Sequence, residues 1–438
     1  MNIQVPEKVN MIIETLLAHG YEAYAVGGCV RDSLLGREAD DWDITTSASP
    51  YEVKELFRRT IDTGIQHGTV TVMLDKEGFE VTTYRIDGEY EDGRHPKEVL
   101  FTKNLEEDLK RRDFTINAMA YNKQAGMVDI FGGVKDLEDK IIRCVGVAGD
   151  RFDEDALRIM RAFRFSAQLG FSIEENTRAA AAERAENLKK ISAERIRVEL
   201  TKLLLSKNPD RLLWMQQNGI TAIVLPEFDA MLATEQKNGA YLYNVGEHTL
   251  RVVEQVGTEG KWSKKELQIL KFAALLHDVE KPGAKKAKEI MRRLKFDNDT
   301  TDMVVRLVAA HDKYIELTVS HEENLAAMRQ MMHSLGPDMM EYLWELQRAD
   351  ILSENPASQE NRMNELARRK KLHREVLERN DCVSLKQLAV NGKDLIELGA
   401  KPGKQIGDIL EQLLEEVLRH PEKNTKDILI NLVKDYTK

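Results

Sequence analysis

The sequence predicts an α+β protein, in which a small mixed β-sheet with flanking helices is followed by an all-helical remainder. Residues 69–74 and 79–84 are alternating runs rich in β-branched and aromatic residues, as half-buried strands are. From about Asp150 onward, apolar residues recur at helical spacing. Roughly two to four domains are expected, because 438 residues are too many for one hydrophobic core.

Local signals predict the elements of the sheet region. Residues 7–19 carry their apolar side chains on one side, which predicts an amphipathic helix that Gly20 ends. Pro50 starts another helix, which runs through Phe57. The two alternating runs are joined by residues 75–78, which predicts a hairpin.

Composition and charge exclude several classes of protein. Apolar residues make up 42% of the chain and no stretch is long enough to span a membrane, so we expect a cytoplasmic protein without a membrane partner. Cys29, Cys144 and Cys382 are far apart, which fits a reducing compartment and no zinc site. The net charge of −10 argues against a nucleic-acid coat, although the basic runs 281–295 and 368–374 would suit either phosphate contacts or solvated helix faces.

A glycine pair marks the first candidate site. Gly27 and Gly28 follow a short apolar run and precede a helix-like segment, an order that presents backbone N–H groups to a phosphate. Asp41-Trp42-Asp43-Ile44 alternates polar and apolar residues, so a strand there would place both carboxylates on one face. Two carboxylates about 6 Å apart repel by roughly 3 kcal/mol at an effective dielectric constant near 20, which favours a cation between them.

Hard oxygen ligands beside a phosphate site suit Mg²⁺. A plain glycine turn and a solvated strand face are the alternative, but the combination favours a metal-dependent nucleotide site and nucleotidyl transfer. Glu80 is a candidate third carboxylate if its strand lies beside Asp41 and Asp43, and an exposed edge glutamate otherwise.

Two polar segments follow the strands. Residues 85–96 are charged and glycine-punctuated, which predicts a mobile loop that closes over a substrate or is merely a surface loop. In the segment 105–120, Arg111 and Arg112 suit phosphate oxygens, whereas Asp113 and Asn117 suit ribose hydroxyls. An internal salt bridge is the alternative interpretation of this segment.

Residues 154–165 predict one helix with an apolar seam. Four charged residues recur there at every third position: Asp155, Arg158, Arg161 and Arg164. An acidic acceptor beside an arginine donor pairs with a base edge, and such a contact discriminates between bases by about 1–3 kcal/mol. The alternative is a surface ion pair worth about 0.2–0.5 kcal/mol.

These motifs together resemble the class II tRNA nucleotidyltransferase and poly(A) polymerase family, in particular its bacterial CCA-adding members. Five stretches carry the resemblance in family order and spacing: residues 27–32 with 41–43, 87–96, 111–113 with 117–119, 129–133 with 136–137, and 154–158. Weaker matches lie at 390–395 and 399–403. The resemblance implies a nucleotidyltransferase head (1–147), a helical neck that recognises the base (148–210), a helical body (211–340) and a tRNA-binding tail (341–438).

The family resemblance also implies the activity and its residues. The activity is template-independent addition of C, C and A to tRNA 3′ ends from CTP and ATP, with two Mg²⁺ ions and release of pyrophosphate. Asp41 and Asp43 would hold Mg²⁺. The nucleotide would be bound by Gly28, Arg31 and Arg112 and its base read by Asp155 and Arg158, helped by Arg161 and Arg164.

Several alternatives stay open at this stage. The segment 87–96 resembles a flexible element associated with the switch to ATP, which argues against an enzyme that adds only C. An enzyme that adds only A, or a poly(A) polymerase, remains. The carboxylates argue against a non-catalytic tRNA-binding module, and the sequence does not give the oligomeric state.

A different motif lies in the second half. Residues 273–282 contain His277-Asp278 and resemble the HD phosphohydrolase motif, so an HD-domain phosphohydrolase is the alternative from another enzyme class. With His248 and Asp350 these residues would form a metal set. No histidine lies between His277 and His311, where complete versions carry another, so we favour a degenerate scaffold.

Overall fold

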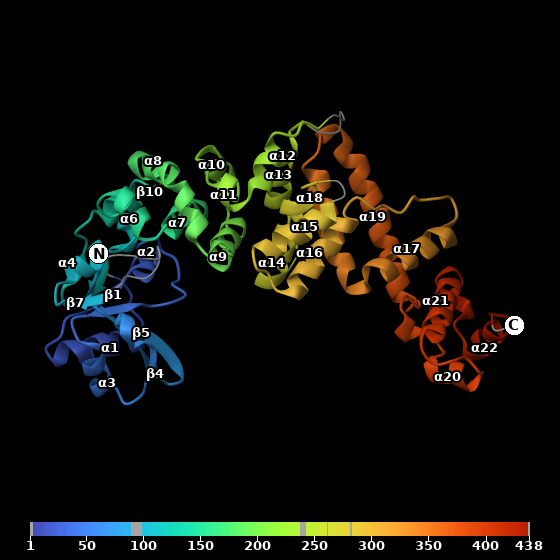
Figure 1. Ribbon diagram of the computed structural model, residues 1–438, viewed down its shortest axis with the longest axis horizontal. Helices are drawn as coiled ribbons and strands as arrows, with labels where there is room; N and C mark the ends of the chain where they lie inside the picture. The colour runs from blue at the N-terminus through green and yellow to red at the C-terminus, as the bar shows by residue number, and fades with distance from the viewer. Residues whose placement is uncertain (1–2, 89–98, 237–241, 261, 281–282, 437–438) are drawn as a thin grey trace. The chain divides into compact units, whose positions relative to one another are not determined.

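The computed structural model describes residues 3–88, 99–236, 242–260, 262–280 and 283–436 (Figure 1). The chain divides into two compact units, Met1–Asp229 and Ala230–Lys438. The first unit contains a mixed sheet and helices and the second is helical, which confirms the predicted fold class. The division into head, neck, body and tail stays a prediction. Within the described residues, no helix is long and apolar enough to cross a membrane.

A seven-stranded sheet forms the centre of the first unit, in the order β3-β4-β5-β2-β1-β8-β9. Strand β2 runs parallel to β5, with Ile44 opposite Val81, whereas the other pairs are antiparallel. The sheet is therefore mixed, as predicted. The strands are β1 (Ala23–Val26), β2 (Ile44–Thr46), β3 (Thr60–Gly64), β4 (Thr69–Leu74), β5 (Glu77–Thr83), β8 (Ala120–Asn122) and β9 (Gly126–Val128).

Three short or medium helices accompany the first strands. Helix α1 (Glu7–Ala18) buries the apolar side that the sequence predicts and ends within one residue of the predicted position. Helix α2 (Gly28–Leu34) follows the glycine pair directly. Helix α3 (Pro50–Leu56) starts at the predicted proline, and Ser49 and Glu52 close its first turn with reciprocal hydrogen bonds to the backbone.

The hairpin between β4 and β5 has a shorter connection than the sequence suggested. Only Asp75 and Lys76 form the turn, with φ of 47° and 72°, because two residues with positive φ match the twist of the strands. Glu77 and Gly78 already pair with β4. Gly78 is needed in the strand because a Cβ atom there would lie 2.8 Å from Cγ2 of Thr71.

The prediction of a loop over residues 85–96 is wrong for the first three residues. Residues Arg85–Asp87 form strand β6, which pairs with β7 (Val99–Phe101), because backbone hydrogen bonding to the returning chain is available there. The rest of the predicted loop falls almost entirely within residues 89–98, which lie outside the described part of the chain.

The predicted helix over 154–165 is interrupted. Asp155 has φ −145° and ψ 103°, so one helix ends before it and another begins after it. Its carboxylate accepts a hydrogen bond from the N–H of Leu157, the first residue of the second helix, which favours this local bond over helical continuity. The helices are α6 (Ala148–Glu154) and α7 (Leu157–Leu169).

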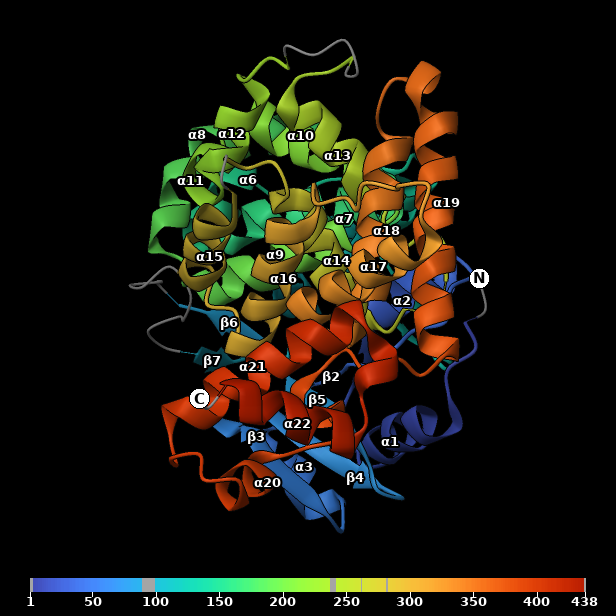
Figure 2. The ribbon, with the colours of Figure 1, turned by 90° about the vertical axis from the view of Figure 1, so that its right-hand side faces the viewer.

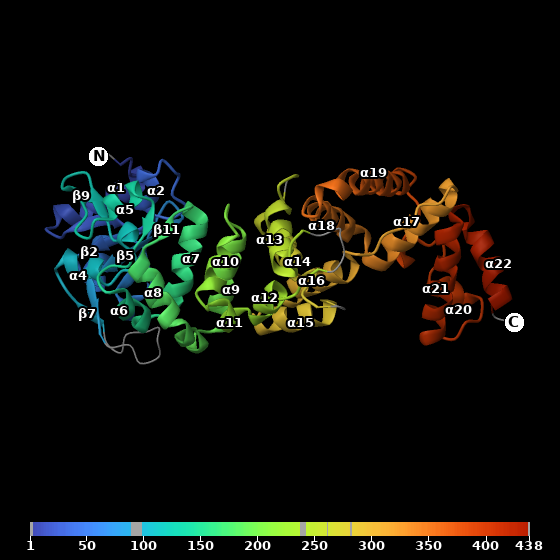
Figure 3. The ribbon, with the colours of Figure 1, turned by 90° about the horizontal axis from the view of Figure 1, so that it is seen from above.

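Further helices complete the first unit, and α7 packs beside α9, as the green segments of Figure 3 show. The remaining elements of this unit are η1 (Ile65–His67), α4 (Leu105–Lys110), η2 (Thr115–Asn117), α5 (Gly133–Glu138), β10 (Ile141–Ile142), β11 (Ser172–Ile173), α8 (Glu175–Glu183), η3 (Ala185–Lys190), α9 (Ala193–Leu204), α10 (Arg211–Gln217), α11 (Thr221–Val224) and α12 (Pro226–Leu232), which crosses into the second unit.

The second unit is built on a buried helical core that includes Trp344, one of the largest buried side chains. Helices α18 and α19 pack side by side, as do α17 and α19 (Figure 2). The helices are α13 (Val245–Gln255), α14 (Lys264–Leu276), α15 (Gly283–Arg293), α16 (Asn298–Ala310), α17 (His321–Leu335), α18 (Met340–Leu352), α19 (Pro356–Glu378), α20 (Gly392–Glu397), α21 (Lys404–Arg419) and α22 (Lys426–Tyr436).

The two basic runs differ in the structure. On α15, Ala287 and Ile290 face the core, whereas Lys285, Lys288 and Arg292 are exposed. On α19, the guanidinium of Arg369 is buried and donates from Nε to the carbonyl of Ile315 at 3.1 Å. The run on α15 is therefore a solvent-facing basic surface, and the run on α19 is partly structural.

Candidate active site

The two candidate aspartates lie immediately before β2 rather than on it. The prediction that Asp41 and Asp43 belong to a strand is wrong in this detail, because the regular ladder of β2 begins at Ile44. The carbonyl of Asp43 still accepts a hydrogen bond from the N–H of Val26 at 3.0 Å, which ties the segment to β1. Both carboxylates are exposed, and Ile44 is buried as expected.

Asp41 and Asp43 open into a cavity of about 590 Å³ at this end of the sheet. The parallel pairing of Ile44 with Val81 places Glu80 beside Asp43, since each residue comes just before a paired one. The condition under which Glu80 is a candidate third carboxylate is therefore met. The cavity is lined by Asp40, Asp41, Trp42, Asp43, Thr71, Glu77, Gly78, Phe79 and Glu80.

The charges around this cavity favour a cation. Surrounding protein raises the pKa of Asp43 although water reaches its side chain; Arg112 opposes that rise and Asp41 adds to it. Partial burial also raises the pKa of Glu80, followed by repulsion from Asp43 and Asp41. Carboxylates that raise one another's pKa are stabilised as anions by a metal ion, so this donor set fits a divalent cation with oxygen ligands.

The glycine pair leaves room for an arginine. Gly27 has φ 82° and ψ −126°, a conformation that favours glycine, and a Cβ atom there would lie 3.0 Å from Nη1 of Arg112. Arg112 and Arg111 both pair with Asp108, which is fully buried. Burial alone would raise the pKa of Asp108, but the two arginines lower it. The internal salt bridge foreseen for this segment therefore exists, with Asp108 as its acid.

Arg31 belongs to a chain of side-chain hydrogen bonds. Its Nε and Nη2 atoms donate to Asp32, and its Nη1 atom donates to Oδ1 of Asn117 at 2.6 Å. Asn117 donates in turn from Nδ2 to Asp113 at 3.1 Å, and Arg161 donates from Nε to the same carboxylate at 2.7 Å. This chain, which we call the Arg31–Arg161 network, joins α2, η2 and α7.

Asp113 is the acidic centre of the Arg31–Arg161 network. Burial alone would raise its pKa, but the charges of Arg161 and Arg158 and the hydrogen bond from Asn117 lower the pKa to about 2. Asp113 therefore stays ionised at neutral pH and holds Arg161 in place. This arrangement makes Asp113 a positioning group rather than an exposed ribose ligand.

The arginines of α7 surround an aromatic ring that the sequence analysis missed. The guanidinium of Arg164 lies 3.8 Å from the centre of the Phe165 ring, and those of Arg31 and Arg161 lie 5.0 and 5.3 Å from it. Arg164 also pairs with the buried Glu199 of α9. The spacing of Arg161 and Phe165, four residues apart on one helix, was a signal for the ring contact.

Asp155 and Arg158 are separated by their partners. The carboxylate of Asp155 pairs with Arg195 at 2.7 Å, whereas Arg158 contacts Glu154 and donates from Nη2 to the carbonyl of Arg111 at 3.0 Å. The expected side-by-side pair is therefore not formed between these two side chains. Both are half-buried, and Arg158 lies close enough to the Arg31–Arg161 network for its charge to lower the pKa of Asp113.

The chain matches three family models along its length. They are the poly A polymerase head domain at residues 23–143, the probable RNA and SrmB-binding site of polymerase A at 170–232, and the putative tRNA nucleotidyltransferase domain 2 at 263–433. The chain is also 38% identical to the CCA-adding enzyme of Lactobacillus delbrueckii subsp. bulgaricus, over 97% of both chains. The chain belongs to the family of CCA-adding enzymes.

Two further comparisons agree with this family. The CCA-adding enzyme of Enterococcus faecalis is 34% identical, over 97% of this chain and 94% of that one. The crystal structure of the Bacillus stearothermophilus CCA-adding enzyme in complex with CTP is similar with a TM-score of 0.74 at 30% identity, over 99% and 98% of the two chains. The expectation of a nucleotidyltransferase enzyme of this family is confirmed, and enzymes of this family use a divalent metal.

In the second unit, the structure brings together the four residues of the predicted second metal set. His248, His277, Asp278 and Asp350 converge from α13, the end of α14 and α18, and His311 joins them from the end of α16. His311 was not included in the predicted set. Its place after α16 on the same apolar side as Leu307 and Val308 was the available signal.

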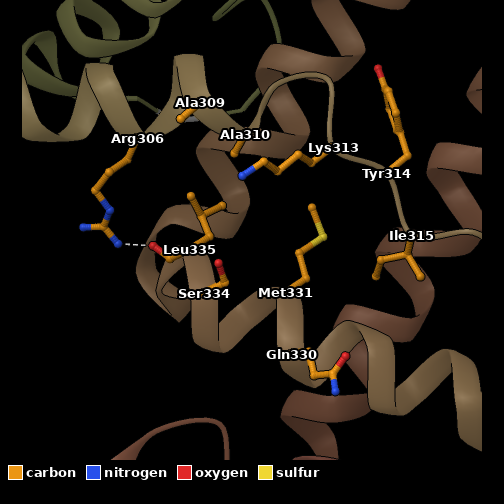
Figure 4. Close-up of a pocket in the computed structure, with 10 residues that line it drawn as sticks. All are labelled: Arg306, Ala309, Ala310, Lys313, Tyr314, Ile315, Gln330, Met331, Ser334 and Leu335. Atoms are coloured by element: carbon orange, nitrogen blue, oxygen red, sulfur yellow. Dashed lines mark hydrogen bonds between the residues drawn. The ribbon is translucent and has the colours of Figure 1, made fainter. Parts of the chain in front are cut away.

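A separate cavity of about 370 Å³ lies against α16 and α17 (Figure 4). Arg306 crosses one side and donates to the carbonyl of Leu335. None of the described residues that line it carries a carboxylate, so it is not a candidate for a carboxylate-bound metal. Its lining residues are Arg306, Ala309, Ala310, Lys313, Tyr314, Ile315, Gln330, Met331, Ser334 and Leu335.

Proposed function

We propose that this protein adds C, C and A to the 3′ end of tRNA without a template, using CTP and ATP and releasing pyrophosphate in the cytoplasm. The observation that carries the proposal is the pair of exposed carboxylates, Asp41 and Asp43, in an acidic cavity close to Arg112 and the glycine pair. Membership of the family supports it over the whole chain. Solved relatives are described in complex with CTP, with ATP and with tRNA.

The divalent ion in this proposal is Mg²⁺, held by Asp41 and Asp43 with Glu80 as a third carboxylate. Oxygen donors and an open cavity that leaves room for substrate phosphates are what Mg²⁺ prefers. When bound, Mg²⁺ lowers the pKa of an attacking hydroxyl and neutralises charge on phosphate oxygens. The chain's own contribution is to present both carboxylates to one cavity, where the charge of Arg112 opposes the rise in the pKa of Asp43.

The phosphate end of the nucleotide lies in this proposal between the glycine pair and the arginines. Gly27 and Gly28 allow close approach of the backbone, and Arg112 offers its guanidinium beside them. Arg31 acts mainly by position, since Asp32 and Asn117 already hold three of its nitrogen atoms.

Base selection is assigned to the start of α7. Asp155 offers acceptor atoms and Arg158 donor atoms, which is the pair of types that a base edge requires. Arg161 and Arg164 support them through Asp113, Glu199 and the Phe165 ring. Nucleotide binding in this scheme requires Asp155 or Arg158 to exchange a protein partner for the base.

Contacts with tRNA are assigned to exposed basic residues of the second unit. Lys285, Lys288 and Arg292 line one exposed side of α15, and Lys401 and Lys404 flank an exposed turn before α21. Such contacts recognise the phosphate backbone and the shape of the RNA rather than its sequence. This suits an enzyme that accepts every tRNA.

The decisive experiment offers tRNA transcripts that lack CCA, CA or only A, with Mg²⁺ and labelled CTP or ATP. We expect C to be added to the first two and A only to the third. Addition of A alone would identify an A-adding enzyme instead, and long A tails on unrelated RNA would identify a poly(A) polymerase. Activity that depends on Asp278 but not on Asp41 would support the HD-domain phosphohydrolase.

A further inference from the structure

One aromatic ring in the first unit is in contact with three positive charges. The guanidinium of Arg164 lies 3.8 Å from the centre of the Phe165 ring. Those of Arg31 and Arg161 lie 5.0 and 5.3 Å from the same centre. An arginine within about 6 Å of a ring centre is attracted to the π-electrons, and significant contacts of this kind occur roughly once per 70–80 residues. Three of them on one ring are more than ordinary packing supplies.

The Phe165 ring has little freedom to move. Phe165 is 6% exposed, and its ring meets that of Phe114 edge to face, with centres 5.8 Å apart and planes at 82°. Phe114 is fully buried, and its backbone N–H donates to the carboxylate of Asp113 at 2.8 Å. The ring is therefore held by the same segment that supplies the acid of the Arg31–Arg161 network.

Arg31 connects the ring to the glycine pair. It belongs to α2, whereas Phe165 belongs to α7. A Cβ atom on Gly28 would lie 3.7 Å from Nη2 of Arg31, so the guanidinium lies against the backbone to which the phosphates are assigned. Asp32 and Asn117 hold its nitrogen atoms by hydrogen bonds. The ring adds a contact from a different helix.

Arg161 connects the same ring to the helix that is assigned to base selection. Its Nε atom donates to Asp113 at 2.7 Å, and its Nη2 atom lies 2.5 Å from the same carboxylate. Among the described residues its Nη1 atom has no hydrogen-bond partner, and 34% of the side chain is exposed. Arg161 therefore keeps a donor for a ligand, while Asp113 and the ring hold the guanidinium in place.

The three guanidinium groups repel one another and are held together by shared contacts. Burial lowers the pKa of Arg164, and the charge of Arg161 lowers it further, which shows this repulsion. Each arginine forms an ion pair with an acid of its own, whereas the ring contacts all three. The ion pairs are Arg31–Asp32, Arg161–Asp113 and Arg164–Glu199.

We propose that Phe165 is a positioning residue for nucleotide binding, whose ring sets the separation between Arg31 at the glycine pair and Arg161 on α7. A nucleotide carries its phosphates at one end and its base at the other, so a fixed separation favours a ligand bound at both ends at once. The inference rests on the proposed function, which assigns these ends to the two places. It adds that both ends are bound through one shared contact.

The competing explanation is that Phe165 only fills the core. A large buried ring stabilises the fold by burial alone, and its loss would lower stability without changing how nucleotides bind. Phe163 offers the comparison, because it lies on the same helix and is fully buried. Among the described residues, no guanidinium lies over the Phe163 ring.

The test compares Phe165→Leu with Phe163→Leu in the full chain. KM and kcat for CTP and UTP are measured on tRNA transcripts that lack CCA, and CTP binding is measured separately by calorimetry. Phe165→Leu should raise KM and Kd for CTP about tenfold, with kcat changed less than about threefold, because the arginines remain but are no longer held at one separation. Its preference for CTP over UTP should fall.

Two further variants complete the comparison. Phe163→Leu should lower the melting temperature like Phe165→Leu but leave KM, Kd and the nucleotide preference within about twofold of the unaltered protein. Phe165→Tyr keeps the ring and should restore values close to those of the unaltered protein. Phe165→Met fills the space without a ring and replaces Phe165→Leu where the smaller side chain does not fold.

Equal KM, Kd and nucleotide preference in Phe165→Leu and Phe163→Leu would overturn the inference. The proposed function would then stand, because the unaltered protein would still add C and A. An unaltered protein that incorporates neither nucleotide would overturn the proposed function instead. Calorimetry with CTP would still decide the role of Phe165 in that case, since it does not depend on incorporation.

Discussion

The acidic cavity of the first unit and the histidine–aspartate cluster of the second unit handle charge in opposite ways. Asp41 and Asp43 are exposed and surrounded by further carboxylates, whereas His248, His277 and Asp350 are buried and hold one another. A group of exposed carboxylates can leave room around a bound metal ion for a substrate. In a buried group of histidines and aspartates, neighbouring protein atoms occupy that room. Accessibility to water, more than residue type, therefore distinguishes these two groups of side chains.

The largest effect is expected for Asp43→Asn in the acidic cavity. Replacing a carboxylate that faces the cavity should reduce incorporation of both CTP and ATP by at least about a thousandfold, because a metal ion contributes several kcal/mol to such a transition state. Binding of tRNA, measured by filter retention, should stay close to that of the unaltered protein. Near-normal incorporation would remove Asp43 from the metal site.

Asp113 is a carboxylate of the first unit that is buried rather than exposed. Its pKa of about 2 lies below the unfolded value of about 3.9, so its ionisation contributes roughly 2–3 kcal/mol to stability at neutral pH. That contribution is present above about pH 4 and is lost as the pH falls toward 2. Asp113→Asn should therefore lower the free energy of unfolding at pH 7 by this amount.

Acid unfolding provides the control for Asp113. The difference in stability between the unaltered protein and Asp113→Asn, measured by denaturant titration at several pH values, should shrink between pH 4 and pH 2. A difference that is the same at all these pH values would mean that the charge of Asp113 is not what stabilises the fold.

A smaller effect is expected for Glu80→Gln at the edge of the open cavity. Loss of one nearby charge should raise the Mg²⁺ concentration needed for half-maximal incorporation by about threefold, with the saturated rate little changed. Glu77→Gln is the matched control, because Glu77 lines the same cavity but pairs with Lys8 at 3.2 Å. Equal effects of the two changes would argue against a specific role for Glu80.

The smallest effect is expected for His277→Gln on nucleotide incorporation. If the buried cluster is independent of transfer, the rate should stay within about twofold of the unaltered protein. The measurement uses the same tRNA transcripts and labelled nucleotides. A loss comparable with that of Asp43→Asn would mean that the two regions are not separate sites.

Local patterns were enough to predict the open site. The glycine pair, the two aspartates and the alternating strands are short-range signals, and their chain order places them at one end of a sheet. The parallel neighbour of β2, and with it the position of Glu80, needed only the assumption that the two strands are adjacent. The fold class followed from the change to helical spacing near residue 150.

Pairing over long distances in the sequence was not predictable. Asp113 binds Arg161 across 48 positions, and Arg164 binds Glu199 across 35. Arg195 holds the carboxylate of Asp155 from another helix, so helical spacing alone could not reveal this ion pair. The hairpin was predicted but its turn was made too long, because neither Asp75 nor Lys76 is of a type that favours positive φ as glycine does.

The Arg31–Arg161 network has a consequence for any attempt to engineer this enzyme. Exchanging the first 147 residues with those of a relative would join Asp113 from one parent to Arg161 from the other. If the second parent lacks an arginine at this position, the buried Asp113 loses its ion pair, which destabilises the fold by roughly 3–5 kcal/mol. Chimaeras should instead cross over near residue 229, where the first compact unit ends and the donors and acceptors of the network travel together.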